Sequence, residues 1–172
     1  EEIIMSKPFV AVLMGSDSDL PVMQTTLDTL SGLGIHYEVK ITSAHRTPAT
    51  TMEFVKNADQ RGCAVFICAA GLAAHLAGNV AAHTVKPVIG VPMDGGPLNG
   101  FDALLSTVQM PGGIPVATVA IGKAGAKNAA YLAAQMLALG DHGLAQKLLE
   151  ERATNARQIA KKDAELQDKL KK

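Results

Sequence analysis

The sequence predicts a three-layer α/β/α sandwich around a parallel five-stranded sheet, with an extra helix at the C-terminus. Two observations carry this prediction. Apolar runs without alternation, such as Phe9–Met14 and Cys63–Cys68, are typical of strands that are buried on both faces. Segments with helical apolar spacing separate the runs. This alternation of strands and helices implies right-handed crossovers between parallel strands.

The first half of the chain supports the prediction element by element. Apolar residues at three- and four-residue steps predict a helix that begins near Leu20 and stops at Gly32. The alternating segment His36–Ile41 indicates a half-buried or edge strand. A second helix is expected from Pro48, with Thr47 as its candidate cap. It leads into the buried run that begins at Cys63.

The second half continues the alternation. Residues 87–92 predict a fourth strand, and a loop rich in Gly and Pro follows over residues 93–100. We expect a helix from about 101 to 109, a fifth strand over 116–121 and then an alanine-rich helix. This succession predicts a flavodoxin-like strand order, in which ligands bind at the carboxyl ends of the strands.

Length and composition fit one soluble domain over residues 1–172. The chain is 48% hydrophobic, which is enough to bury a core without disulfides or metals. Residues 1–7 are interpreted as an N-terminal extension. Residues 141–172 are interpreted as a helical tail for oligomer packing: apolar side chains over 141–160 suit a neighbouring subunit, and charge beyond about 160 favours a solvated end.

Charge and cysteine usage narrow the function classes. The 16 basic and 16 acidic residues balance, so no electrostatic footprint for nucleic acid or an anionic membrane is present. No stretch is long and apolar enough to span a bilayer. Cys63 and Cys68 are five apart in one strand, which predicts opposite faces rather than a bridge, and this favours a reduced, cytoplasmic protein.

Three predicted strands end in polar or glycine-containing turns, which are Gly15–Asp19, Ser43–Arg46 and Ala70–His75. The carboxyl ends of parallel strands meet at one edge of the sheet, so these turns should converge. Arg46 could hold a phosphate together with helix-end amides and the hydroxyl of Ser43 or Ser18. Asp17 and Asp19 would repel a phosphate and suit a ribose diol, so the turns together predict a ribonucleotide site.

Other cofactors and metals are not indicated. No Gly-x-Gly-x-x-Gly follows the first strand, and no Gly-Lys-Ser or Gly-Lys-Thr is present, which argues against NAD and ATP. The five histidines show no ligand spacing, so the sequence predicts no metal and no cofactor.

His45 lies between Ser43 and Arg46 at a strand end, where an imidazole could move a proton on and off a substrate. His75 could pin the turn around Gly71 and contact the ligand in part. Taken singly, each feature also has a structural interpretation, because Ser-Asp turns cap helices, a lone histidine is commonly a structural group, and an arginine beside a turn is often solvated.

Taken together, these segments resemble a known family. They occur in order as Gly15–Asp19, Ser43–Pro48, Ala70–Leu76 and Gly90–Pro92, and the likeness continues over roughly residues 9 to 140. The chain closely resembles the N5-carboxyaminoimidazole ribonucleotide mutases of purine biosynthesis. That family has an α/β/α fold and forms homo-octamers in which the C-terminal helix reaches a neighbour, so the resemblance implies both here.

The resemblance also implies a reaction and its residues. The family interconverts N5-carboxyaminoimidazole ribonucleotide and 4-carboxy-5-aminoimidazole ribonucleotide without metal, ATP or organic cofactor. It implies His45 as the catalytic acid and base. The residues that it implies for substrate binding are Ser16, Ser18, Asp19, Ser43, Arg46, Gly71, Ala73, His75 and Leu76.

The sequence departs from the family's pattern at Ala77, because the family more often has proline at this position of the turn. Two alternative functions also remain open. A related group carboxylates aminoimidazole ribonucleotide directly and typically has lysine at the position of Arg46, so Arg46 favours the mutase. A non-catalytic, flavodoxin-like nucleotide-binding module would need the site but not His45.

Overall fold

A computed structural model of the chain describes residues 7–171. Most of the expected N-terminal extension, residues 1–7, lies outside the described residues. The chain divides into two compact units, one up to Met136 and one from Leu137 onward, and each is described by itself.

The first unit is built on a five-stranded sheet in which every neighbouring pair is parallel. The strand order is β2-β1-β3-β4-β5, which confirms the predicted flavodoxin-like topology. The strands are β1 (Phe9–Met14), β2 (Tyr37–Ile41), β3 (Cys63–Ala70), β4 (Val88–Pro92) and β5 (Ala117–Thr118).

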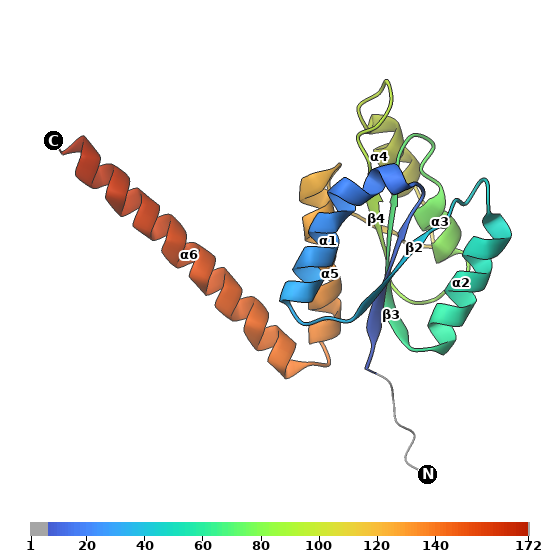
Figure 1. The fold of residues 1–172 in the computed structure, drawn as a ribbon, viewed down its shortest axis with the longest axis horizontal. Coiled ribbons are helices and arrows are strands. Elements are labelled where there is room, and N and C mark those ends of the chain that lie inside the picture. Colours follow the sequence, from blue (N-terminus) through green and yellow to red (C-terminus); the bar gives the residue numbers. More distant parts are fainter. Residues whose placement is uncertain (1–6, 172) are drawn as a thin grey trace, which may run out of the picture. The chain divides into compact units, whose positions relative to one another are not determined.

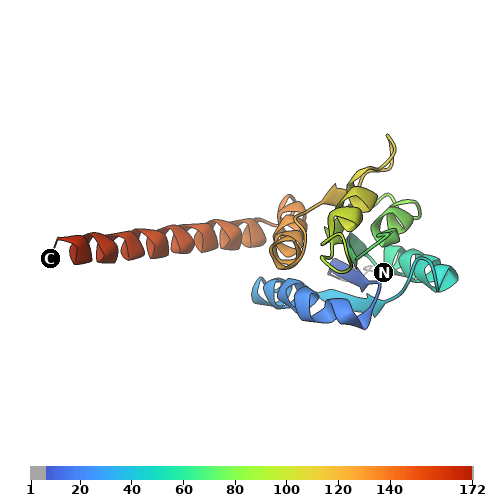
Figure 2. The ribbon, with the colours of Figure 1, turned by 90° about the horizontal axis from the view of Figure 1, so that it is seen from above.

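Helices cover both faces of the sheet, so the predicted three layers are confirmed (Figure 1). They are α1 (Leu20–Gly32), α2 (Pro48–Gln60), α3 (Leu76–Ala81), α4 (Phe101–Val108) and α5 (Lys123–Ala138), with a 3-10 turn η1 (Asp17–Asp19) before α1. The helices α1 and α5 lie on one face, and α2, α3 and α4 lie on the other (Figures 1 and 2). The hydroxyl of Thr26 in α1 donates to the Ala126 carbonyl oxygen in α5 at 2.7 Å, which joins the first pair.

The strand β5 is shorter than the predicted span of 116–121, and it lies at an edge of the sheet, where it pairs with β4. Pro115 precedes it without an N–H to donate, and Gly122 turns the chain away with a φ of 75°. The strand pairing lasts for two residues, and two further bonds join the following segment to β4, from Val119 N to Gly90 O at 3.1 Å and from Gly122 N to Pro92 O at 2.9 Å.

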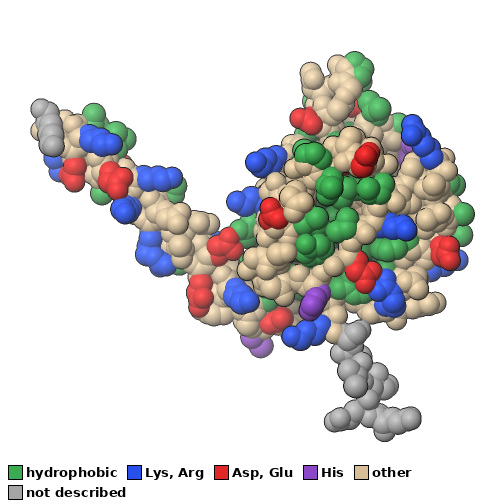
Figure 3. Space-filling view, in the orientation of Figure 1, with side chains coloured by type: hydrophobic (Ala, Val, Ile, Leu, Met, Phe, Trp, Pro, Cys, Tyr) green, Lys and Arg blue, Asp and Glu red, His purple; other side chains and the backbone are tan. Residues whose placement is uncertain are grey.

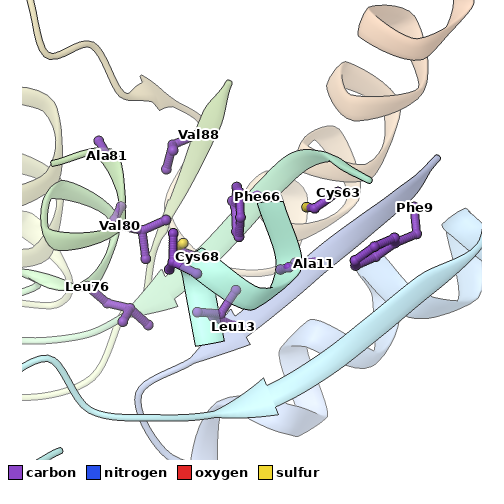
Figure 4. Packing of buried hydrophobic residues seen from close by; sticks show 13 residues of the cluster. Phe9, Ala11, Leu13, Cys63, Phe66, Cys68, Leu76, Val80, Ala81 and Val88 are labelled. Atoms are coloured by element: carbon purple, nitrogen blue, oxygen red, sulfur yellow. The ribbon is translucent and has the colours of Figure 1, made fainter. Parts of the chain in front are cut away.

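The prediction that Cys63 and Cys68 face opposite ways is wrong. The pairing of β1 with β3 shifts register directly after Cys63, so Ala64 is an extra residue that breaks the two-residue alternation. Both cysteines therefore join one hydrophobic cluster between the sheet and helices α2 and α3 (Figure 4). Both are free thiols, and burial raises the pKa of Cys63 to about 11 and also raises the pKa of Cys68.

The second unit contains α6 (His142–Leu170). The Asp141 carboxylate caps this helix by accepting the Leu144 N–H at 3.0 Å. The helix continues well beyond residue 160, where the sequence favoured a solvated end, and Gln167 donates to Asp163 at 3.3 Å within that part. Basic and acidic side chains are interspersed along it (Figure 3). None of the helices in residues 7–171 is long and apolar enough to cross a membrane.

Candidate active site

The carboxyl ends of β1, β2, β3 and β4 surround a cleft of about 680 Å³. Ten residues that the sequence singled out line it, namely Ser16, Ser18, Asp19, Ser43, His45, Arg46, Gly71, Ala73, His75 and Leu76. Asp17, which was predicted together with Asp19 to suit a ribose diol, does not line the cleft. The predicted convergence of the three turns is therefore present. The roles of the individual residues remain predictions.

The β1–α1 turn forms the first wall of the cleft. Gly15 N donates to Ala69 O at 3.1 Å, which ties the turn to the end of β3. The Ser16 hydroxyl caps η1 by accepting the Ser18 N–H at 3.2 Å, and it lies 2.9 Å from the Ser18 hydroxyl. These contacts hold both serine side chains at the start of a helix, where oriented amides favour an anion or a hydroxyl-rich ligand.

Asp19 is the half-buried carboxylate of this wall. Burial raises its pKa above the usual 3.8, nearby Asp17 raises it further, and a hydrogen bond from the Ser16 backbone opposes both effects. Because the charged form is poorly solvated in the folded protein, the ionised carboxylate lowers stability there. A ribose diol that donates hydrogen bonds to Asp19 would offset this cost.

We expect Asp19→Asn to raise the free energy of unfolding at neutral pH. The folded-state pKa of Asp19 is raised, so its ionisation penalises folding above that pKa, and the penalty disappears below the unfolded-state value, where both states are protonated. Urea titrations of both proteins between pH 3 and pH 7 should therefore show a stability difference that shrinks on acidification. A difference that grows on acidification would contradict this assignment.

The β2–α2 loop forms the second wall and carries Ser43, His45 and Arg46. The loop is a closed turn, because Thr47 N donates to Ser43 O at 2.8 Å and Arg46 N donates to the Ser43 hydroxyl at 3.1 Å. Thr47 occupies the N-cap position of α2 as predicted, but its hydroxyl does not cap the helix. It accepts Ser43 N at 3.0 Å instead, so it holds the preceding turn rather than the helix that follows.

The imidazoles of His45 and His75 meet across the cleft. His45 Nε2 lies 3.3 Å from His75 Nδ1, and the ring centroids are 5.4 Å apart at a tilt of 52°. The two nitrogens can share one hydrogen, with one ring donating and the other accepting. Both side chains are exposed, so a ligand in the cleft can reach the pair.

The β3–α3 turn forms the third wall from small residues. Leu72 adopts a positive φ of 56°, which is uncommon for a side chain of this size. A Cβ at Gly71 would lie 3.4 Å from Met93 Cβ, in ordinary van der Waals contact, so the turn packs closely against the end of β4. Leu76 lines the cleft from the start of α3, although its side chain is only 2% exposed. This wall is narrow, mostly apolar and adjacent to His75.

The β4–α4 loop closes the cleft and was missed as a site element. Met93, Asp94, Gly95 and Gly96 all line it. A Cβ at Gly96 would lie 2.3 Å from Leu72 Cδ2, so this glycine lets the loop pack against the β3–α3 turn. The sequence does contain a signal for this part of the site, because the glycine-rich segment directly follows the fourth predicted parallel strand. No group of three His, Cys, Asp or Glu residues within 7–171 could hold a metal ion.

Comparison with known proteins places this geometry in a family. A family model described as AIR carboxylase matches residues 9–171. The chain belongs to this family. It is 53% identical over 152 residues to the N5-carboxyaminoimidazole ribonucleotide mutase of Bacillus subtilis, a match that covers 88% of this chain and 93% of the relative.

Further members of the family agree in sequence and in fold. The N5-carboxyaminoimidazole ribonucleotide mutase of Thermotoga maritima is 51% identical over 160 residues, covering 93% of this chain and 92% of the relative. The crystal structure of Treponema denticola PurE superposes with a TM-score of 0.84 at 31% identity, covering 93% of this chain and 99% of that one. These matches include both units of the chain.

Proposed function

We propose that this protein is an N5-carboxyaminoimidazole ribonucleotide mutase of purine biosynthesis. It interconverts N5-carboxyaminoimidazole ribonucleotide and 4-carboxy-5-aminoimidazole ribonucleotide within one catalytic domain and without a cofactor. Relatives that share about half of its residues over most of their length carry that name. The observation that carries the proposal is the His45–His75 pair, set between a polar wall and a small apolar wall.

The polar walls are suited to the ribonucleotide part of the substrate. The Arg46 guanidinium provides the positive charge for the phosphate, and the hydroxyls of Ser43 and Ser18, which line the same cleft, donate hydrogen bonds to it. The Ser16 hydroxyl donates to a ribose oxygen, and the Asp19 carboxylate accepts hydrogen bonds from the ribose hydroxyls. In this arrangement the phosphate and the ribose of the substrate bind to the two turns that precede α1 and α2. The base of the substrate then faces the two histidines.

The reaction requires the enzyme to donate one proton to the substrate and to remove one proton from it. His45 protonates the carbamate nitrogen, the bond between that nitrogen and the carboxyl carbon breaks, and its electron pair stays on the nitrogen as carbon dioxide leaves. The ring carbon C4 then attacks the carbon dioxide and forms the new carbon–carbon bond. His45 finally removes the proton from C4, so the imidazole returns to its starting state.

Carbon dioxide must stay in place between the two steps. The third wall, which includes Gly71, Ala73 and Leu76, is small and mostly apolar, so it can hold the molecule beside the nucleophile without strong polar competition. Holding it there replaces a diffusional encounter by a high effective concentration. His75 orients His45 through the 3.3 Å contact and borders the same space.

The direct assay supplies N5-carboxyaminoimidazole ribonucleotide to the purified protein and follows the 4-carboxy product. A parallel reaction contains aminoimidazole ribonucleotide with bicarbonate. Turnover in the first reaction without added carbon dioxide supports the mutase. Product in the second reaction alone would identify a direct carboxylase, and binding without turnover in either would identify a nucleotide-binding module.

We also propose that the protein works as a cytoplasmic homo-oligomer, an octamer as in the family. The helix α6 keeps large apolar side chains exposed on one face, with Leu149 at 63%, Ile159 at 66% and Leu170 at 71%. A second copy of the chain would cover this stripe. The two buried free thiols are compatible with a reducing compartment.

Removal of residues after Gly140 should therefore reduce the oligomer to smaller species, because it deletes α6. Light scattering on the full chain and on the truncated chain measures the change in mass. The far-ultraviolet circular dichroism of the truncated chain controls for folding of the sheet. A folded monomer for the full chain would contradict the proposal.

A further inference from the structure

Three threonine hydroxyls lie together beneath the loop that carries His45. Thr42 directly follows β2 and is 3% exposed, Thr51 lies in α2 and is 0% exposed, and Thr47 joins them at the start of that helix. Thr42 Oγ1 lies 2.7 Å from Thr51 Oγ1 and 3.2 Å from Thr47 Oγ1. None of the proposed substrate contacts uses these hydroxyls.

The hydrogens of the three hydroxyls can be assigned in one consistent order. Thr47 donates to Ser43 O at 3.1 Å, and Thr51 donates to Thr47 O at 3.1 Å. Each hydroxyl has a single hydrogen, so in this order Thr42 supplies the one in its short contact with Thr51, where either oxygen can be the donor. Every hydroxyl hydrogen then has an acceptor. Thr42 is bonded to Thr51 and Thr51 to the backbone oxygen of Thr47, while the Thr47 hydroxyl donates to Ser43 O and accepts the Ser43 N–H.

This chain of bonds is anchored in the sheet. Thr42 N donates to Met14 O at 3.0 Å, so the first hydroxyl is tied to β1 as well as to β2. His45, by contrast, has an exposed side chain, and little packing restrains its ring. The position of the imidazole therefore depends on the backbone of the turn. The Thr47 hydroxyl holds this backbone by accepting the Ser43 N–H and donating to Ser43 O.

We propose that Thr51 and Thr42 are positioning residues that hold His45 within reach of His75 and of the substrate, by fixing Thr47 beneath the turn. The inference rests on the proposed function for its kinetic consequence. Without the Thr51 hydroxyl, Thr47 O keeps only the Thr51 N–H as its donor, and the hydrogen of Thr42 turns to Thr47 Oγ1 at 3.2 Å, which already bonds both backbone groups of Ser43. The turn then shifts although every residue that meets substrate is still present.

Kinetics separate this role from a purely structural one. Proton transfer needs hydrogen-bond reach, whereas attraction between Arg46 and a phosphate falls slowly with distance. Thr51→Val, which keeps the shape and removes the hydroxyl, should lower kcat on the order of 10- to 100-fold and raise KM by less. Thr51→Ser restores the hydroxyl and should return kcat to near the wild-type value.

The matched control is Thr26→Val. Thr26 is also 0% exposed and donates to a backbone oxygen at 2.7 Å, but it lies in α1 outside the cleft. This variant should lose stability and keep kcat. Equal losses of kcat in Thr26→Val and Thr51→Val, or no rescue by Thr51→Ser, would overturn the proposal.

The second readout does not depend on turnover. Nuclear magnetic resonance of the His45 imidazole, assigned with His45→Asn, should show a changed chemical shift in Thr51→Val but not in Thr26→Val. If the wild type fails to convert the ribonucleotide, the proposed function fails and the His45 signal still decides the positioning role. An unchanged His45 signal in Thr51→Val would overturn that role whatever the activity.

Discussion

Replacing His45 by Asn is expected to lower kcat by about 100- to 10,000-fold, the range typical of a general acid or base. Asparagine keeps a similar shape and some hydrogen bonding, but it cannot give and take a proton within one turnover. Binding should survive, because the proposed phosphate and ribose contacts lie on other residues. Steady-state kinetics together with calorimetric titration of the nucleotide would show binding and chemistry separating.

Two variants control the His45 measurement. His36→Asn makes the same chemical change at an exposed histidine outside the cleft, and it should leave kcat unchanged. His75→Asn removes the 3.3 Å partner and should cost less than His45→Asn, because it disturbs orientation rather than the proton itself. Near-normal turnover in His45→Asn together with an inactive His75→Asn would assign the proton to His75.

The part of the site that could be predicted is the part that local sequence determines. Continuous apolar runs such as Phe9–Met14 mark buried parallel strands, and the residues after each run must then lie at one edge of the sheet. Ser16, His45 and His75 follow three predicted strands, so the sequence predicts that they lie together. Their meeting follows from strand order, since β1 lies between β2 and β3.

The remaining features depend on contacts between distant segments. Counting by twos along β3 placed Cys63 and Cys68 on opposite faces, but the extra residue Ala64 appears only when β3 pairs with β1. In the same way Thr47 has the sequence position of a cap, whereas its hydroxyl is occupied by Ser43. Neither local propensity nor periodicity contains that information.

The β4–α4 loop shows the same limit at the active site. Its glycines suggested a turn, and a turn after a parallel strand lies on the ligand side. Its contribution to the cleft requires Gly96 to accept the side chain of Leu72, whose own backbone has a positive φ. That pairing joins two loops more than twenty residues apart, so the sequence indicated the loop but not its part in the wall.

Replacing Arg46 by Ala is expected to weaken binding of every substrate form by about 10- to 100-fold, because a hydrogen bond to a charged group contributes about 1.5–3 kcal/mol. The loss should appear chiefly in KM and in the nucleotide dissociation constant. Arg46→Lys should recover only part of it, because lysine keeps the charge but lacks the planar fork that grips a phosphate.

Arg61→Ala is the matched control, because Arg61 follows the other end of α2, pairs with Glu38 and does not line the cleft. It removes the same charge from the molecule, so any general electrostatic effect on an anionic substrate appears in both variants and only the contact itself distinguishes them. Salt should weaken nucleotide binding by the wild type more than by Arg46→Ala. Unchanged KM and kcat in Arg46→Ala would move the phosphate away from this turn, towards the amides and serines that precede α1.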